Sequence, residues 1–155
     1  MKEELYNLGI KGLIRSTEGK VLLLQINPAH MPGNKHGNYW DLPGGRVQHN
    51  ENVKDTLVRE IEEEIGVSKI SNVKSVGMVV SNIRIPLHHA HGTKGVENDE
   101  TIGLILGVYS CSIPEDSTIT ISEEHLGYDW FAPTEAAKLL AVKYPADLCD
   151  IIAKL

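Results

Sequence analysis

A run of acidic and aliphatic residues between positions 44 and 67 constrains the fold of this chain more than any other stretch. It reads GGRVQHNENVKDTLVREIEEEIGV and carries five acidic residues between Asp55 and Glu64. Aliphatic side chains recur at every fourth position, at Val53, Leu57, Ile61 and Ile65. This spacing is typical of one face of a helix. The segment therefore predicts an amphipathic helix whose apolar face packs against a core.

Residues that favour helix termini mark both ends of this segment. Asn52 suits the N-cap, because its side chain can accept a hydrogen bond from a backbone N–H group of the first turn. Asp55 follows three residues later, at the position where a capping box has Glu or Gln. Gly66 suits the position just after the last turn, where left-handed backbone ends many helices. The helix is therefore expected between Asn52 and Gly66.

Three glutamates form the centre of the polar face of this helix. Glu60, Glu63 and Glu64 are three and four residues apart, so their carboxylates project from one side. Like charges at this spacing destabilise an isolated helix, and a bound divalent cation offsets their repulsion. Ligands that are all oxygen suit Mg²⁺, Mn²⁺ or Ca²⁺ better than Zn²⁺. The residues alone indicate a metal site, and a solvated acidic helix is the alternative.

The same stretch resembles the Nudix box, G-x5-E-x7-R-E-U-x-E-E-x-G-U, in which U is a bulky aliphatic residue. It matches at every defined position, at Gly45, Glu51, Arg59, Glu60, Ile61, Glu63, Glu64, Gly66 and Val67. A merely solvated helix explains neither this spacing nor the flanking glycines. The approach to the box, from Trp40 to Gly45, and a looser S-E-E-H…Y-x-W-F segment from Ser122 to Phe131 also resemble this family.

The resemblance implies a hydrolase that uses Mg²⁺ or Mn²⁺ to cleave a nucleoside diphosphate linked to another group. It implies metal ligands at the Gly44 carbonyl and at the carboxylates of Glu60, Glu63 and Glu64. Glu51 is implied to be an outer or water-mediated contact of the metal. Arg59 is implied to pair with the box carboxylates and to fix their orientation, a task that suits a planar guanidinium.

The general base stays open, because members of the family use either a box glutamate or one from a later loop. Glu60 is the candidate within the box. Glu124 is the first candidate downstream, and Glu123, Glu97 and Glu100 follow it. The candidate catalytic set is Glu60, Glu63, Arg59 and Glu124. Arg46 and Trp40 flank the Pro-Gly-Gly turn and are candidate substrate contacts, with core packing as the alternative for Trp40.

The substrate is not encoded in the box. The first hypothesis is a nucleoside triphosphate, cleaved to a monophosphate and pyrophosphate, and the second is ADP-ribose or a dinucleoside polyphosphate. A non-catalytic nucleotide-sensing module is an alternative from another class, but such modules commonly lose box glutamates that are intact here. An isomerase of isoprenyl diphosphates would carry a modified box. A homodimer is common in the family.

Length and charge set further bounds. The 155 residues predict a single domain, 1–155. With 15 basic and 21 acidic residues, the net charge of −6 is poorly suited to binding a nucleic-acid polymer. Cys111 and Cys149 lie far apart in no metal-like spacing, so we expect reduced thiols. No apolar run is long enough to span a membrane, and a cytoplasmic protein is expected.

Apolar runs between turn residues predict strands around the acidic helix. Strands are expected at 5–16 and 20–26 as a hairpin, at 39–42, at 71–86 with a bend near Gly77, at 101–112 and at 118–122. Helices are expected at 135–142, with Thr134 as N-cap, and at 145–154. This order predicts an α+β fold. The family resemblance implies an α/β/α sandwich, with a mixed β-sheet flanked by the box helix and the C-terminal helices.

The polar segment 87–100 contains His88, His89 and His91. A zinc site would need a further partner and a stable scaffold, and the segment offers no second pair of ligands. We therefore expect a mobile loop here, and a lid over the substrate is its functional version, since long loops in compact domains are often functional.

Overall fold

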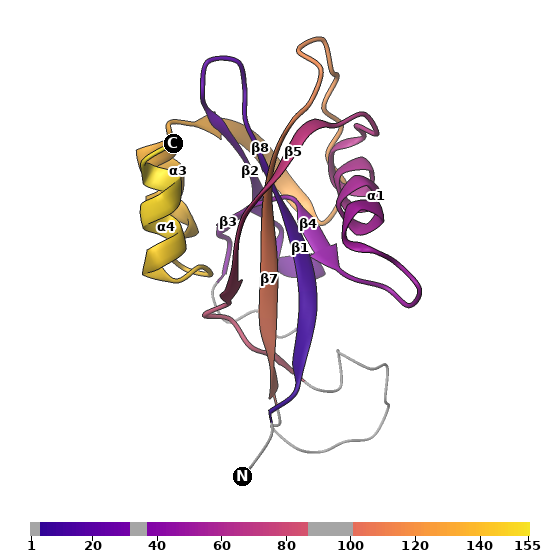
Figure 1. Cartoon of the computed structure of the whole chain (residues 1–155), viewed down its shortest axis with the longest axis vertical. Coiled ribbons are helices and arrows are strands. Elements are labelled where there is room, and N and C mark those ends of the chain that lie inside the picture. The colour runs from indigo at the N-terminus through magenta and orange to yellow at the C-terminus, as the bar shows by residue number, and fades with distance from the viewer. Residues whose placement is uncertain (1–3, 32–36, 87–100) are drawn as a thin grey trace.

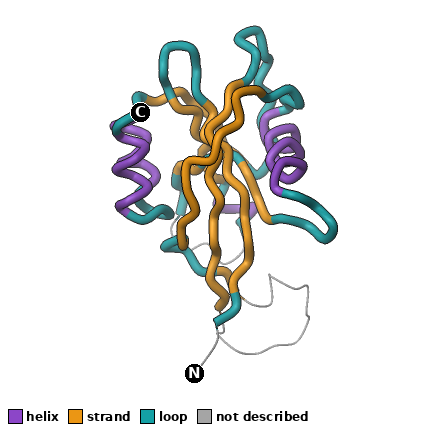
Figure 2. The backbone as a smooth tube through the Cα atoms, viewed as in Figure 1, coloured by secondary structure: helices purple, strands orange, loops and turns teal. Residues whose placement is uncertain are grey.

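The structure is a computed structural model, and it describes residues 4–31, 37–86 and 101–155. Two β-sheets lie between helix α1 on one side and helices α3 and α4 on the other (Figure 1). Figure 2 shows the same arrangement, with the strands between two helical layers. The expected α+β sandwich is therefore confirmed.

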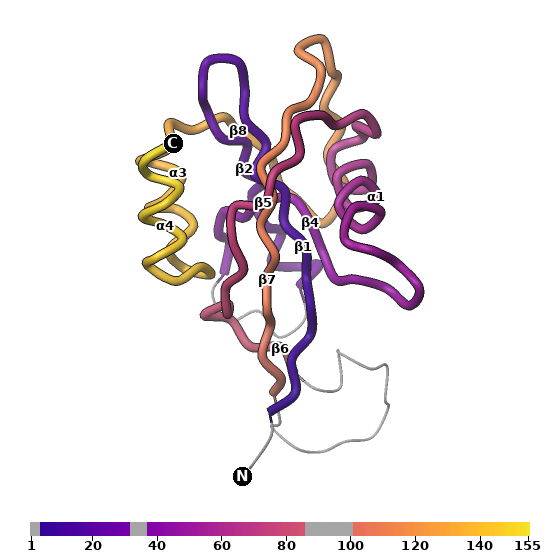
Figure 3. Tube along the Cα trace, viewed as in Figure 1, coloured from indigo at the N-terminus to yellow at the C-terminus, as the bar shows by residue number. Residues whose placement is uncertain are grey.

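The first sheet has the strand order β4-β1-β7-β5, and β6 also pairs with β7. Its strands are β1 (Tyr6–Ile14), β4 (Gly44–Arg46), β5 (Ser71–Val80), β6 (Ile85–Pro86) and β7 (Thr101–Ser112). The sheet is mixed, because β1 runs parallel to β7 while the other pairs are antiparallel. The long path of β7 beside β1 and β5 can be followed in Figure 3.

The second sheet has the order β3-β2-β8 and is antiparallel. Its strands are β2 (Val21–Ile26), β3 (Trp40–Asp41) and β8 (His125–Phe131). Among the described residues, the helices are the 3-10 turn η1 (Pro28–His30), α1 (Val53–Ile65), α3 (Pro133–Leu140) and α4 (Ala146–Ala153). The prediction had no counterpart for the short strand β4 or for β8.

The expected hairpin between the first two strands forms only at its turn, where the Ser16 N–H donates to the Lys20 carbonyl at 2.9 Å. Arg15 and Val21 form an isolated antiparallel bridge, and beyond it β1 and β2 diverge into different sheets. Both strands are buried along most of their length, and each pairs with neighbours of its own sheet. A run of apolar residues shows that a strand is buried but does not identify its partner, so the sequence pattern is the same for a hairpin and for this splayed pair.

Helix α1 packs on the sandwich through the face that the sequence predicted. Leu57, Ile61 and Ile65 are fully buried. They share a core with residues of the two sheets, Ile10, Ile14, Leu22, Leu24 and Cys111. Gly12 of β1 lies directly beneath the helix, where an added Cβ would come within 3.1 Å of the Ile61 side chain. The absence of a side chain there lets the helix lie close to the sheet.

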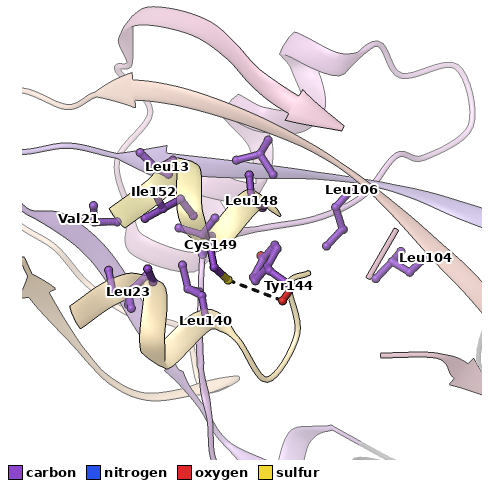
Figure 4. Close-up of a cluster of buried hydrophobic side chains, with 14 residues drawn as sticks. Leu13, Val21, Leu23, Leu104, Leu106, Leu140, Tyr144, Leu148, Cys149 and Ile152 are labelled. Carbon is purple, nitrogen blue, oxygen red and sulfur yellow. Dashed lines mark hydrogen bonds between the residues drawn. The ribbon is translucent and has the colours of Figure 1, made fainter. Parts of the chain in front are cut away.

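A second core lies between the sheets and the two C-terminal helices. Leu13, Val21, Leu23, Leu104 and Leu106 contribute from the strands, and Leu140, Tyr144, Leu148, Cys149 and Ile152 from the C-terminal segment (Figure 4). The Cys149 Sγ lies 3.7 Å from the Tyr144 carbonyl oxygen, which its thiol donates to. Cys111 and Cys149 are both free thiols.

The termini of α1 agree with the sequence prediction. The Asn52 side chain accepts a hydrogen bond from the Asp55 N–H, and Gly66 ends the helix with a φ of 72°. The N-cap expected at Thr134 is wrong, because α3 begins at Pro133 and Ala132 is its N-cap. Proline is favoured at the first helical position, where its missing N–H costs nothing.

Two predicted strands also differ in the structure. The strand expected at 71–86 divides into β5 and β6, and the register of β5 shifts between Ser75 and Gly77, close to the expected bend. The strand expected at 118–122 is instead an irregular segment beside the end of α1. Its Thr120 and Ser122 N–H groups donate to the carbonyls of Ile65 and Glu64. It therefore satisfies carbonyls that the last helical turn leaves free.

Two further expectations concern membrane-spanning helices and the polar segment 87–100. Within the described ranges, no helix is long and apolar enough to cross a membrane. The histidines at 88, 89 and 91, together with Glu97 and Glu100, lie outside the described residues.

Candidate functional site

Arg59 on α1 holds three of the box carboxylates. Its Nε and Nη2 donate to the two oxygens of Glu51 at 2.6 and 2.9 Å. Its Nη1 donates to Glu60 Oε1 at 2.6 Å and to Glu63 Oε2 at 3.1 Å. The Nη2 also donates to the backbone carbonyl of Arg46, beside the glycine turn. One planar cation thus orients carboxylates from the turn before the helix and from the helix itself.

Glu51 is held as a carboxylate by several donors. Besides Arg59, the Thr56 hydroxyl donates to Glu51 Oε2 at 2.7 Å and the Gln48 N–H donates at 3.1 Å. The hydrogen bonds from Arg59 and Thr56 lower the pKa of Glu51 to about 2. Both oxygens of Glu51 are therefore already engaged, as suits a residue that supports a site from its edge.

Glu60 lies against the glycine turn. A Cβ placed on Gly45 would overlap the Glu60 carboxyl group, so the box glycine makes room for a carboxylate beside the backbone. Burial raises the pKa of Glu60, while Arg59 acts in the opposite direction. The carboxyl group is thus partly desolvated, and it lies next to a permanent cation.

Glu64 is the most buried of the box glutamates, with 7% of the residue exposed. Its Oε2 accepts a hydrogen bond of 2.5 Å from the Gly44 N–H, and its Oε1 lies 3.5 Å from His125 Nε2. Burial raises the pKa of Glu64 to about 8, against the opposing effect of Lys11. A nearby cation would offset the cost of ionising this carboxyl group.

Lys11 of β1 contacts the other side of the glycine turn, and sequence reasoning missed it. Its Nζ donates to the Gly44 carbonyl at 2.8 Å, to the Leu42 carbonyl at 2.9 Å and to Asp41 Oδ2 at 3.0 Å. The side chain is buried. A lysine within the otherwise apolar run GIKGLI was the signal that could have identified it, because a buried lysine needs partners.

Asp41 connects this turn to the C-terminal helices. Besides Lys11, it accepts hydrogen bonds from Lys143 Nζ at 2.5 Å and from the Tyr144 hydroxyl at 2.6 Å. Burial alone would raise the pKa of Asp41, but Lys11 and Lys143 hold it well below its usual range. The buried aspartate is therefore ionised, and two lysines compensate its charge.

His125 is a second residue that sequence reasoning left without a role. Its ring is buried between the segment before β8 and the last turn of α1, and its Nδ1 lies 3.2 Å from the Ser122 hydroxyl. Burial lowers the pKa of His125 to about 4, so the ring is neutral near pH 7. The contact with Glu64 is therefore a polar contact between two neutral groups near pH 7.

The other candidates lie at the edge of this site or outside it. The side chains of Glu63 and Arg46 are exposed. Glu124 is exposed too, and no polar contact joins its carboxylate to the box within the described residues. Trp40 packs edge-on against Phe131, with ring centroids 4.9 Å apart, beside the core of α3 and α4. This geometry agrees with the packing interpretation of Trp40.

The expected metal ligands have the right chemistry, but they do not form a closed shell. In the part of the chain that the structure describes, no three Asp, Glu, His or Cys side chains are gathered around one point. Arg59 engages Glu60 and Glu63, and Lys11 donates to the Gly44 carbonyl. All the donors are oxygens, as Mg²⁺ and Mn²⁺ prefer, and two of the carboxyls are desolvated. The donor set therefore fits a divalent cation.

Comparisons with known proteins agree with this geometry. The family model of the NUDIX domain matches residues 5–148. The nucleoside triphosphatase NudI of Escherichia fergusonii is 32% identical over 99 residues, which cover 64% of this chain and 65% of that protein, less than two thirds of its length. The CTP pyrophosphohydrolase of Escherichia coli is 27% identical over 134 residues, covering 86% of this chain and 78% of that protein.

A solved structure, that of the MutT protein from Methanosarcina mazei Go1, has a similar fold. It aligns with a TM-score of 0.66 at 25% identity and covers 99% of this chain and 95% of that chain. The likeness therefore extends over both sheets and over α1, α3 and α4.

Proposed function

Because this chain belongs to the NUDIX domain family, we propose that it is a metal-dependent pyrophosphohydrolase that cleaves a nucleoside triphosphate to a monophosphate and pyrophosphate. The observation that carries this proposal is the cluster of Glu51, Glu60 and Glu63 around Arg59, with the buried Glu64 beside the glycine turn. The names of two relatives, a nucleoside triphosphatase and a CTP pyrophosphohydrolase, support the substrate class.

Enzymes of this family generally use divalent metal ions. In this chain the ion would be held by Glu60, Glu63, Glu64 and the Gly44 carbonyl, with Glu51 in an outer position. Bound there, Mg²⁺ or Mn²⁺ would neutralise charge on the phosphate oxygens and make a bound water more acidic. Because Glu64 is innermost and Glu63 lies at the surface, the substrate would approach the ion from the side of Glu63.

Arg59 contributes orientation. Its guanidinium stays charged throughout, and its bidentate bond to Glu51 anchors it while Nη1 aligns Glu60 and Glu63. Fixed charges that need no rearrangement as the reaction proceeds are the main source of electrostatic stabilisation in such sites.

Two glutamates are candidates for the general base. Glu60 lies in the cluster, and its raised pKa makes it a better proton acceptor than an ordinary carboxylate. Glu124 lies in the exposed turn before β8, and it would need to approach a bound substrate from outside the cluster. Glu60→Gln should lower kcat in either case, because it also removes a proposed metal ligand. Glu124→Gln therefore distinguishes the candidates: we expect it to leave kcat nearly unchanged if the base is in the box and to lower kcat strongly if the base is in the turn.

A panel of substrates tests the proposal. The purified chain is incubated with nucleoside triphosphates, ADP-ribose and dinucleoside polyphosphates, with EDTA, Mg²⁺ or Mn²⁺, and the products are separated by chromatography. We expect a triphosphate to give monophosphate and pyrophosphate, only with metal. Glu63→Gln is the control variant and should lose the cleavage activity. Its side chain is exposed, so the loss of its charge does not disturb the core.

Two other results would contradict the proposal in different ways. Cleavage of ADP-ribose or a dinucleoside polyphosphate alone would keep the chemistry and replace the substrate class. Tight binding of a nucleotide with no cleavage at any metal concentration would favour a sensing module. The homodimer that the resemblance suggests stays a prediction, which light scattering after size exclusion checks.

A further inference from the structure

The proposed function uses Glu124 of the S-E-E-H segment but assigns no role to His125. This histidine begins β8, and its residue is 6% exposed. Its two ring nitrogens have different neighbours: Nε2 lies 3.5 Å from Glu64 Oε1, and Nδ1 lies 3.2 Å from Ser122 Oγ. The ring therefore stands between a box carboxyl group and a hydroxyl group on a separate segment.

The backbone fixes His125 relative to Glu64. The Ser122 N–H donates to the Glu64 carbonyl at 3.1 Å, and the Thr120 N–H donates to the Ile65 carbonyl at 3.0 Å. The His125 N–H in turn donates to the Ser122 carbonyl at 3.1 Å. The segment that carries the histidine is thus attached to the same residue of α1 that its ring contacts.

The two oxygens of Glu64 have partners from two different elements. Oε2 accepts from the Gly44 N–H of β4, and Oε1 faces the imidazole of β8. A neutral imidazole has one donor and one acceptor. When a bound cation keeps Glu64 ionised, a carboxylate at Nε2 and a hydroxyl at Nδ1 match the tautomer with its proton on Nε2, in which the Ser122 hydroxyl donates to Nδ1. This arrangement limits rotation of the carboxylate about its last bond.

We infer that His125 is a positioning residue for Glu64: its Nε2–H holds Oε1 so that the carboxylate presents a fixed orientation to a divalent cation, and Ser122 sets the ring tautomer. This inference rests on the metal site of the proposed function. Removing a residue that hydrogen-bonds to a metal ligand and orients it typically weakens metal binding about 10–100-fold. The alternative is that His125 only fills space between α1 and β8.

A pair of substitutions distinguishes positioning from space filling. Leucine at 125 keeps the volume and removes the donor, whereas the amide nitrogen of glutamine can place a donor near the position of Nε2. We expect His125→Leu to weaken binding of Mn²⁺ by about 10–100-fold and His125→Gln to stay within about threefold of the parent chain. Ser122→Ala should give a smaller loss, because it frees the tautomer without removing the ring.

The measurement is Mn²⁺ binding by calorimetry and by the electron paramagnetic resonance signal of free Mn²⁺, without nucleotide. The melting temperature of each metal-free variant is measured beside it. If His125→Leu fails to fold, His125→Asn replaces it, because the shorter asparagine amide mimics Nδ1 and not Nε2. Tyr128→Phe, on the exposed part of the same strand, is the matched control and should bind as the parent chain does.

A double-substitution cycle tests whether His125 acts through Glu64. Glu64→Gln removes the carboxylate, and adding His125→Leu to it should then cause no further loss of Mn²⁺ affinity. An undiminished loss in that background, or parent-like binding by His125→Leu alone, would overturn the inference. Because binding is measured without substrate, Mn²⁺ binding without nucleotide cleavage would contradict the proposed function and leave this inference standing.

Discussion

At the scale of single residues, the glutamates of the box differ in how readily they carry a charge. Glu51 is surrounded by donors, and its pKa falls to about 2. Burial raises the pKa of Glu60 and brings that of Glu64 to about 8. A glutamate side chain is thus ionised at the edge of the site, at Glu51. In the interior, at Glu64, it keeps its proton near pH 7 unless a cation binds. Because of these differences in pKa, the stability of the metal-free protein should depend on pH.

The stability of the metal-free protein should fall between about pH 7 and pH 8. Folded Glu64 keeps its proton up to about pH 8, whereas an unfolded glutamate releases it near 4.5, so unfolding releases a proton in this range and is favoured as pH rises. His125, with a folded pKa of about 4 and an ordinary value of 6.5, is mostly neutral in both states above pH 7. We expect a loss of about 1 kcal/mol, measured by urea unfolding in EDTA.

Glu64→Gln should flatten this pH dependence, because the amide does not titrate. The exposed Glu63→Gln is the matched control and should keep the slope. Saturating Mg²⁺ should also remove the slope if the ion binds ionised Glu64, since binding to the folded state adds stability. An unchanged slope in Glu64→Gln would show that another group causes it.

At the scale of elements, α1 serves two functions from its two faces. Leu57, Ile61 and Ile65 anchor it on the sheets, and Gly12 lets it lie close enough for Glu60 and Glu64 to reach the glycine turn. The position of the carboxylates therefore depends on how the opposite, apolar face of α1 packs on the sheets. A rigid element holds such groups more precisely than a loop would.

Ile61→Ala should destabilise the protein by about 2–5 kcal/mol, because it leaves a cavity at a fully buried position. The control is Glu62→Ala, on the exposed face of the same helix, which should change stability by less than about 0.5 kcal/mol. Urea unfolding measures both. An equal effect of the two variants would mean that α1 does not depend on this contact.

At the scale of the whole molecule, a buried charge network joins the parts of the sandwich. Asp41 of β3 contacts Lys11 of β1 in the other sheet, and Lys143 and Tyr144 between the C-terminal helices. Lys11 continues the network to the Gly44 carbonyl in the glycine turn. The turn that serves the box is thereby attached to both sheets and to the α3–α4 connection.

Asp41→Asn should therefore destabilise the whole fold. The substitution leaves two buried lysines without their anion, and breaking a buried charge network in this way costs about 3–5 kcal/mol. Asp150→Asn, at an exposed position of α4, is the control and should be nearly neutral. Chemical unfolding with two probes measures the change. A neutral Asp41→Asn would show that the lysines lose their charge or reach water instead.

Features of the chain that depend on near neighbours were predictable from the sequence. The period of the aliphatic residues, the Asn52 cap and the Gly66 terminus determine α1, because each acts within one or two helical turns. The box spacing likewise placed Arg59 beside Glu63, since residues four apart share a face of the helix. The box motif also carried the resemblance to the family, and that resemblance implied the sandwich fold.

Contacts between distant segments were decided by the tertiary structure. Asp41 meets Lys143 across 102 positions, and Glu64 meets His125 from another strand, in pairings that no local period encodes. The divergence of β1 and β2 belongs to the same class, because the sequence determines that both strands are buried and not which strands they pair with. These partners are determined by burial in the protein interior, because a buried charge needs an opposite charge and a buried backbone group needs a hydrogen-bond partner.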